Sequence, residues 1–199
     1  MHHTSEEILT ADQALERLLI GNRRYIAMRQ LHPRQSVVHR QHLVQGQHPF
    51  AAILSCSDSR VPSELIFDQG LGDLFIVRTA GHAVDDLVLA SLEYAVFALQ
   101  VPLVMVLGHT ACGAVTSVME AHALPGHLPK LAASLKPALA PIDAEAKDAL
   151  EQAIRVNSLY TAAFLAKNSL IFQEAIAKGR VKIVAAYYAL STGEVQLLE

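Results

Sequence analysis

Short, mostly apolar runs recur along the chain, and glycine, proline or polar residues bound each of them. Four runs have the length and composition of buried strands: residues 50–55, 73–77, 102–107 and 181–188. A turn-forming segment at residues 191–194 precedes a further apolar run, which predicts a hairpin with a final antiparallel strand. The pattern therefore predicts a central sheet of buried strands.

Segments with the period of a helix separate these runs, at residues 61–67, 85–99, 113–122 and about 143–178. Gly179 predicts the end of the last helix. Buried strands that alternate with helices are typical of a parallel sheet covered on both faces. We expect an α/β fold: a single domain over residues 1–199, with a mostly parallel central β-sheet flanked by helices and an antiparallel edge strand.

The N-terminal segment is amphipathic over residues 5–30. Ser5 or Thr10 could cap helices in this arm, and Gly21 predicts a break. The apolar face of the arm needs a partner, which is either the chain's own core or another subunit. Residues 31–49 carry few large apolar side chains and predict a connector with a short helix.

Composition narrows the functional classes. Charged residues make up 18% of the 199 residues and hydrophobic residues 52%, which excludes a disordered polyelectrolyte. The formal net charge is −3 and there is no basic block, so we expect no nucleic acid and no anionic membrane surface as partner. Two cysteines cannot form a secreted disulfide framework, and the first residues show no secretory signal. We expect a cytoplasmic protein.

One stretch is long enough to raise the question of a membrane span. Residues 94–119 contain no charged side chain, yet Gln100, Pro102, Gly108 and His109 interrupt them. The continuous apolar part is short and has the pattern of a buried strand. We therefore expect no membrane-spanning segment.

Chemically competent side chains follow the predicted strands. Ligands of open parallel sheets bind beyond the carboxyl ends of the strands, and here those ends carry residues 55–60, 78–82 and 108–113. Both cysteines, a histidine, an aspartate and two arginines lie in these three segments. We expect the functional site at this edge.

These residue types fit a metal. His109 and Cys112, three residues apart at the start of a predicted helix, are expected on one helix face, and Cys56 and Asp58 on one side of an extended segment. Two thiolates, an imidazole and a carboxylate make a plausible tetrahedral zinc set. The alternative is that the cysteines are small buried residues and His109 a hydrogen-bonded core histidine.

Asp58 and Arg60 decide which kind of zinc site this would be. Asp58 as the fourth ligand would close the site, as in structural zinc centres, whereas a water in that position would make it catalytic. A bidentate ion pair with Arg60 could hold the carboxylate away from the metal. The alternative for Arg60 is a surface charge that caps a turn.

The order and spacing of these residues carry a specific resemblance. Cys56-Ser-Asp58-Ser-Arg60, with His109-Thr-Ala-Cys112-Gly beginning 53 residues after Cys56, resembles the signature of the β-class carbonic anhydrases, specifically their plant-like, open-site subgroup. The likeness extends from residues 21–25 to residues 188–193. It implies one zinc ion per chain on Cys56, His109 and Cys112, a catalytic Asp58–Arg60 dyad, and reversible hydration of carbon dioxide to bicarbonate and a proton.

The same resemblance implies substrate-binding positions. Gln47 matches a glutamine that donates to substrate, Tyr94 matches an aromatic residue lining the pocket, and Gly81 lies in a segment of the same site. Many members have asparagines in this segment, where this chain has Thr79 and His82. His82 could relay protons, or it could be a structural residue, which is the more common role of a lone histidine.

The resemblance further implies a homodimer or homotetramer, with the helical arm of residues 1–30 on a neighbouring subunit. Two other functions fit the same zinc site: hydrolysis of carbonyl sulfide or carbon disulfide, and a catalytically silent zinc-binding module with Asp58 permanently ligated. Arg60 argues against the silent module, because a purely structural site needs no device to release Asp58. A redox dithiol is weaker still, since the cysteines are not in a Cys-x-x-Cys arrangement.

Overall fold

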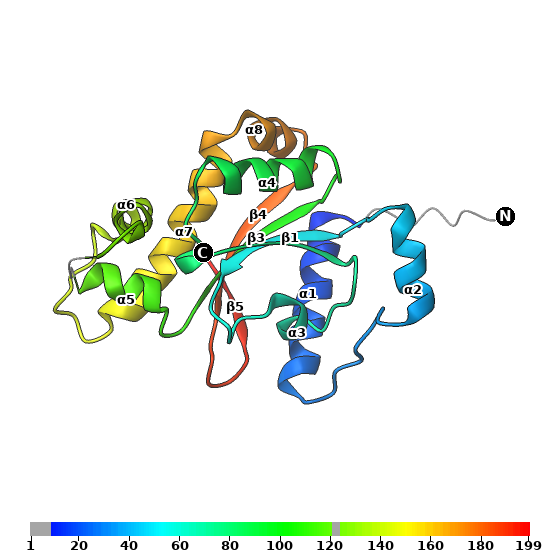
Figure 1. Cartoon of the computed structure of the whole chain (residues 1–199), viewed down its shortest axis with the longest axis horizontal. Coiled ribbons are helices and arrows are strands. Elements are labelled where there is room, and N and C mark those ends of the chain that lie inside the picture. The colour runs from blue at the N-terminus through cyan, green and yellow to red at the C-terminus, as the bar shows by residue number, and fades with distance from the viewer. Residues whose placement is uncertain (1–8, 121–123) are drawn as a thin grey trace.

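A five-stranded sheet in the order β2-β1-β3-β4-β5 forms the centre of the molecule (Figure 1). The structure is a computed structural model of the chain, and it describes residues 9–120 and 124–199. The first four strands in this order are parallel and β5 runs antiparallel to β4. The strands are β1 (Ala51–Cys56), β2 (Leu74–Thr79), β3 (Leu103–His109), β4 (Lys182–Tyr188) and β5 (Val195–Leu198). The predicted fold class is confirmed, including the antiparallel edge strand.

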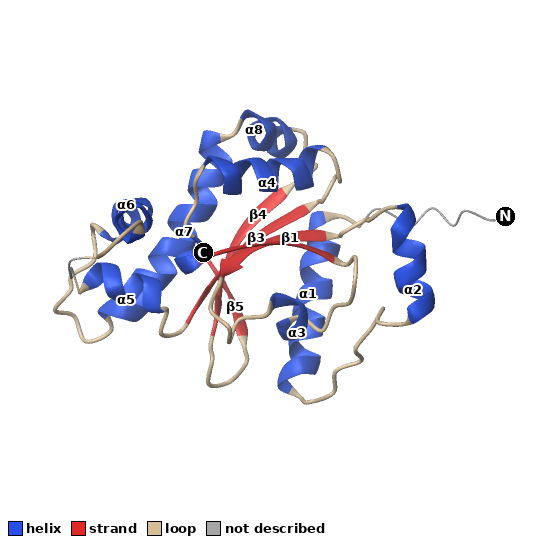
Figure 2. Cartoon of the chain, viewed as in Figure 1, coloured by secondary structure: helices blue, strands red, loops and turns tan. Residues whose placement is uncertain are grey.

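Helices connect the strands and cover the sheet (Figure 2). The α-helices are α1 (Ala11–Ile26), α2 (Val37–His42), α3 (Ser63–Ile66), α4 (Asp86–Phe97), α5 (Gly113–Met119), α6 (Leu128–Leu139), α7 (Ala149–Asn168) and α8 (Leu170–Ala177). Two short 3₁₀ helices are η1 (Leu43–Gln45) and η2 (Ala80–His82).

Successive side chains of the central strand β1 enter two different cores, as the alternation of a strand requires. Ile53 is fully buried in the core that contains Leu18 of α1, whereas Leu54 is fully buried in the core that contains Leu92 of α4 and Phe172 of α8. Figure 1 shows α1 and α3 on one side of the sheet and α4, α7 and α8 on the other. Both faces are covered, which explains why the central strands have no polar alternation.

The N-terminal helix differs from the prediction at Gly21. Thr10 caps α1 as expected, in a capping box with Gln13, whereas Ser5, the other expected cap, lies outside the described residues. The helix continues through Gly21. A Cβ at Gly21 would lie 1.7 Å from the carbonyl oxygen of Phe67. The predicted break is therefore wrong: this glycine permits close packing of α1 on the chain after α3.

The apolar stripe of α1 has a place within its own chain. Ala14 and Leu18 are fully buried against the sheet. Asn22 donates to the carbonyl oxygens of Ile66 and Gly193, and its own side-chain oxygen accepts from the backbone N–H of Val195. The packing of the arm on a neighbouring subunit stays a prediction.

The helical segments of the second half are divided more finely than predicted. The predicted helix over about residues 143–178 begins only at Ala149 and is divided in two. Ser169 ends α7, and its side chain caps α8 by accepting from the N–H of Phe172. The helix α6 was not predicted. Gly179 ends α8 with a φ of +65°, as expected. The predicted helix 113–122 ends at Met119, and its last two residues lie outside the described part of the chain.

Candidate metal centre

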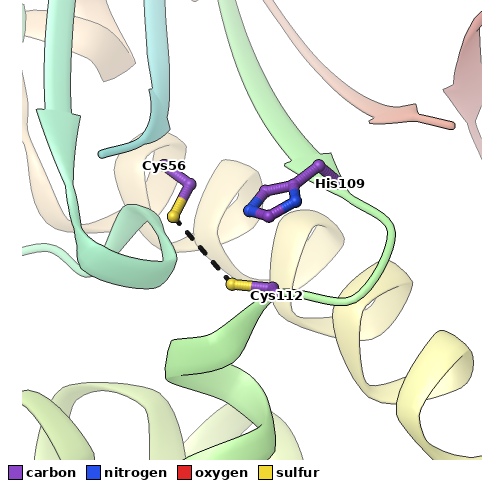
Figure 3. A group of neighbouring side chains, drawn as sticks. All are labelled: Cys56, His109 and Cys112. Carbon is purple, nitrogen blue, oxygen red and sulfur yellow. Dashed lines mark hydrogen bonds between the residues drawn. The ribbon is translucent and has the colours of Figure 1, made fainter. Parts of the chain in front are cut away.

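Three ligand-type side chains meet at the carboxyl end of the parallel strands, two from the strands themselves and one from the start of α5 (Figure 3). Cys56 is the last residue of β1 and His109 the last residue of β3. Cys112 directly precedes the first residue of α5. Since β1 and β3 pair in parallel, their carboxyl ends meet, and residues far apart in the sequence become neighbours.

The path from His109 to Cys112 is a turn and not the helical face expected. His109 is still in the strand, Ala111 has a φ of +54°, and Cys112 is the N-cap residue of α5. The left-handed residue reverses the chain so that the imidazole and the thiol converge. The expected proximity of the two side chains holds, but the expected helical i, i+3 geometry is wrong.

The three ligand atoms form a compact, buried group. They all lie within 4.8 Å of one another, and the sulfurs of Cys56 and Cys112 are 4.0 Å apart. Nδ1 of His109 lies 2.9 Å from the carbonyl oxygen of Thr110, which leaves Nε2 for the group. In the described part of the chain, this Nε2 is the one buried side-chain nitrogen or oxygen without a hydrogen-bond partner.

These observations fit a zinc ion. Two sulfurs and an imidazole nitrogen are the donor set that zinc prefers, and a metal-binding histidine commonly donates its other N–H to a carbonyl. A buried, unpartnered nitrogen costs free energy unless something occupies its lone pair. A metal ion supplies that partner.

The two thiols titrate as a pair. The hydrogen bond from Cys112 lowers the pKa of Cys56 to about 3. The same bond, together with burial, raises the pKa of Cys112. One thiol therefore ionises readily, and the charge of its thiolate disfavours ionisation of the second thiol. A bound divalent cation would remove this repulsion.

Asp58 and Arg60 stand beside the group as a closed ion pair. Nε and Nη2 of Arg60 donate to the two carboxylate oxygens of Asp58 at 2.9 and 2.7 Å, and the backbone N–H of Arg60 donates at 2.9 Å. These hydrogen bonds hold the pKa of Asp58 well below its usual range. Oδ2 of Asp58 lies 3.9 Å from Nε2 of His109, while Arg60 bonds both carboxylate oxygens.

Three hydrogen bonds support Cys56 and the loop that follows β1. Arg78 of β2 donates to the carbonyl oxygens of Cys56 and Asp58, at 3.0 and 2.6 Å. The N–H of Gly81 donates to the sulfur of Cys56 at 3.2 Å. The sequence predicts Arg78 at this end of the sheet but assigns it no role. In the structure its guanidinium holds the backbone of this loop.

A family model described as Carbonic anhydrase matches residues 51–195. The chain belongs to the carbonic anhydrase family. Carbonic anhydrase 2 of Mycobacterium tuberculosis is 43% identical over 181 residues, which cover 89% of this chain and 87% of that protein. A carbonic anhydrase of Mycolicibacterium smegmatis is 40% identical over 189 residues, with coverage of 89% and 88%.

Solved β-carbonic anhydrases share the fold. The Coccomyxa β-carbonic anhydrase in complex with acetazolamide superimposes with a TM-score of 0.75 at 25% identity, covering 92% of this chain and 86% of that one. A tetrameric β-carbonic anhydrase from Sordaria macrospora gives 0.70 at 28% identity, covering 80% and 85%. The chain is thus a carbonic anhydrase of the β-class, an enzyme for the hydration of carbon dioxide. Neither alternative function is favoured.

No helix in the described residues is long and apolar enough to cross a membrane.

Two of the expected substrate-binding residues lie away from the metal centre of their own carbonic anhydrase chain. Gln47 is exposed before the start of β1, and the six residues of that strand separate it from Cys56 by roughly 20 Å. Tyr94 is 53% exposed, and its ring lies 6.2 Å from that of Phe75, near the amino end of β2. Gly81, in contrast, lies directly against Cys56.

Thr79 and His82, where many carbonic anhydrases have asparagines, make hydrogen bonds of their own. Thr79 donates to the carbonyl oxygen of Ala83 at 2.7 Å and closes the turn. His82 is 2% exposed, and burial lowers its pKa to about 4, so its imidazole is neutral and shielded from solvent. Its burial and hydrogen bonds favour the structural role for His82. Asn157 and Ser158 of α7, which contact His82, were missed, since nothing in the sequence marks them.

Proposed function

We propose that this carbonic anhydrase binds one zinc ion per chain through Cys56, His109 and Cys112, and that Asp58 and Arg60 serve catalysis at this centre. The observation that carries the proposal is Nε2 of His109, buried and unpartnered between two sulfurs. A bound zinc ion would supply the Lewis acid that makes water a nucleophile near neutral pH.

The ion pair of Asp58 and Arg60 then has two tasks. The carboxylate, ionised throughout the neutral range, accepts a hydrogen bond from the attacking water and directs a lone pair of that water toward carbon. Arg60 occupies both carboxylate oxygens and so restrains Asp58 from becoming a fourth ligand. With zinc bound, the pair would thus keep Asp58 from closing the site to substrate.

The position of Gln47 and Tyr94 supports a homodimer or homotetramer. Neither residue is close to the metal centre of its own chain, so each can line a pocket only at the site of another subunit. The helix that carries Tyr94 exposes apolar side chains, with Leu87 78% and Phe97 75% exposed. The neighbouring strand β2 is an edge of the sheet. The tetrameric Sordaria macrospora enzyme has the same fold.

The cysteine chemistry supports a cytoplasmic location. Both cysteines are free and buried in the candidate metal site, and zinc binding needs both as thiolates. A reducing compartment keeps them in that state.

Metal analysis and stopped-flow hydration of carbon dioxide on one preparation test the proposal. The freshly purified enzyme should contain one zinc per chain and hydrate carbon dioxide, whereas Cys112→Ser should lose both properties because a hydroxyl replaces a thiolate ligand. Ser117→Ala, on the same helix, is the matched control and should keep both. Full zinc content in Cys112→Ser would refute the ligand set.

A parallel assay separates the substrates that share such a site. Carbonyl sulfide and carbon disulfide are offered to the same preparation, and their turnover is compared with that of carbon dioxide. We expect carbon dioxide to be the strongly preferred substrate.

A further inference from the structure

Two polar residues in the middle of α7, Asn157 and Ser158, lie behind the metal centre and take no part in the steps above. Asn157 is 1% exposed and Ser158 is fully buried. A buried amide or hydroxyl destabilises the fold unless it is hydrogen-bonded. Their partners therefore indicate why they are there.

The amide of Asn157 contacts the turn that follows β2. Its Nδ2 donates to the carbonyl oxygen of Gly81 at 3.1 Å and lies 3.2 Å from Nδ1 of His82. Nε2 of His82 lies 3.1 Å from the hydroxyl of Ser158, which itself donates to the carbonyl oxygen of Ile154. Asn157, His82 and Ser158 thus join Gly81 to the body of α7.

The turn they hold has an uncommon backbone. Gly81 has a φ of +61° and His82 a φ of +47°, so two successive residues adopt left-handed conformations, the second without the freedom of glycine. A Cβ at Gly81 would lie 3.1 Å from both Ala114 and Leu135, so the turn is also tightly enclosed. In this conformation the N–H of Gly81 donates to the sulfur of Cys56.

We propose that Asn157 is a positioning residue of the metal centre, acting through Gly81. Its bond to the Gly81 carbonyl fixes the left-handed turn, and the turn fixes the N–H that donates to Cys56. A hydrogen bond to a thiolate withdraws charge from the sulfur and orients its lone pairs. Residues behind the ligands of a metal typically change metal affinity about 10- to 100-fold when they are replaced.

This inference rests on the zinc site of the proposed function, and its test reads the metal and not only the activity. Zinc affinity is measured by competition with a chromophoric chelator for the wild type, Asn157→Ala and Asn157→Ser. The absorption of the cobalt(II)-substituted proteins reports charge transfer from thiolate to metal. Ser134→Ala is the matched control, because Ser134 donates to Val84 just after the same turn but does not contact Gly81.

We expect about tenfold weaker zinc binding in both Asn157 variants. Their charge-transfer band should move to lower energy, because a sulfur that loses its hydrogen bond gives up an electron more easily. The control should match the wild type in both measurements. Wild-type affinity and an unshifted band in the Asn157 variants would overturn the inference, as would failure of both variants to fold, which would make Asn157 purely structural. Absence of zinc from the wild type would instead overturn the proposed function.

Discussion

Asp58 is held on both carboxylate oxygens by Arg60, and its pKa lies below the usual value of about 3.9 because those hydrogen bonds favour the charged form. A carboxyl group with a lowered pKa in the folded state contributes stability above its unfolded pKa. That contribution is lost only as the pH falls through the lowered value. Asp58 therefore stays ionised across the neutral range, and activity changes near neutrality cannot be due to its protonation.

The first prediction therefore attributes the pH dependence of activity to the zinc-bound water and not to Asp58. Wild-type hydration activity should rise as the pH increases from about 6 to 9, because two thiolate ligands leave the zinc a weaker acid than three imidazoles would. Arg60→Ala should keep its zinc and lose activity about 10- to 100-fold at every pH, since the freed carboxylate can approach the metal. Asp58→Ala should also lose activity because the acceptor is gone. Stopped-flow kinetics with metal analysis measures all three proteins. Turnover of Arg60→Ala at the wild-type rate, with normal zinc content, would exclude the pair from the mechanism.

The grouping of Cys56, His109 and Cys112 could be predicted from the sequence, because these residues lie at or just after the carboxyl ends of neighbouring strands. The bond from Gly81 to Cys56 could not, since it depends on two left-handed residues and on an asparagine from a distant helix. Resemblance placed Gly81 at the site as a substrate-binding residue, and the structure adds its contact with a metal ligand.

Among the elements, α1 is joined to two distant segments of the chain by the side-chain amide of Asn22. Asn22 is 3% exposed and bonds three backbone groups. One is the carbonyl of Ile66, the last residue of α3, and the other two are the carbonyl of Gly193 and the N–H of Val195, at the turn into β5. Such a side chain joins three segments that are far apart in the sequence. Its removal leaves all three groups without their partner.

The second prediction follows from this. Asn22→Ala should lower the free energy of unfolding by about 2 kcal/mol, because buried backbone groups lose their hydrogen bonds. Urea unfolding at a fixed protein concentration measures the change. Arg23→Ala, one residue along on the exposed face of the helix, is the control and should change stability little. Equal stability of the two variants would contradict the structural role of Asn22.

The element boundaries show which signals a sequence carries. Strand positions followed from buried apolar runs between glycines, and all five strands were predicted. The predicted break at Gly21 was wrong because the glycine is required by tertiary packing. The carbonyl of Phe67 occupies the space where a side chain would lie. The helix α6 was missed because Pro129 and Pro137 oppose a helical interpretation, although one lies in its first turn. Ser169 is a local signal, a cap that could have been recognised.

At the scale of the whole molecule, the exposed apolar side chains of α4 lie beside the free edge of β2. Leu87, Tyr94 and Phe97 together form an apolar surface that a monomer would leave in water. The third prediction is that Phe97→Asp weakens self-association, because an interface would have to bury its charge. It should also lower activity, since Tyr94 on the same helix would no longer reach a neighbouring subunit.

Sedimentation at micromolar concentration and carbon dioxide hydration measure these two effects together. Leu170→Asp places the same charge at another highly exposed apolar position, 77% exposed at the start of α8, and serves as control. If the wild type sediments as an active monomer, the interpretation of this surface is wrong. Dissociation in both variants alike would remove α4 as the specific interface.

The separation of Gln47 from Cys56 by the length of β1 has a consequence for oligomers that contain two different variants. On the proposed zinc site and subunit arrangement, a Cys112→Ser subunit should hold no zinc but still carry Gln47. A Gln47→Ala subunit should hold zinc but lack the glutamine proposed for its neighbour's pocket. Each variant should be poorly active alone. Co-expressed, the two should complement each other, because a hybrid pairs one intact zinc site with the intact glutamine of the other chain. Activity in the hybrid above that of either parent would show that two genes, each defective, can encode one working enzyme.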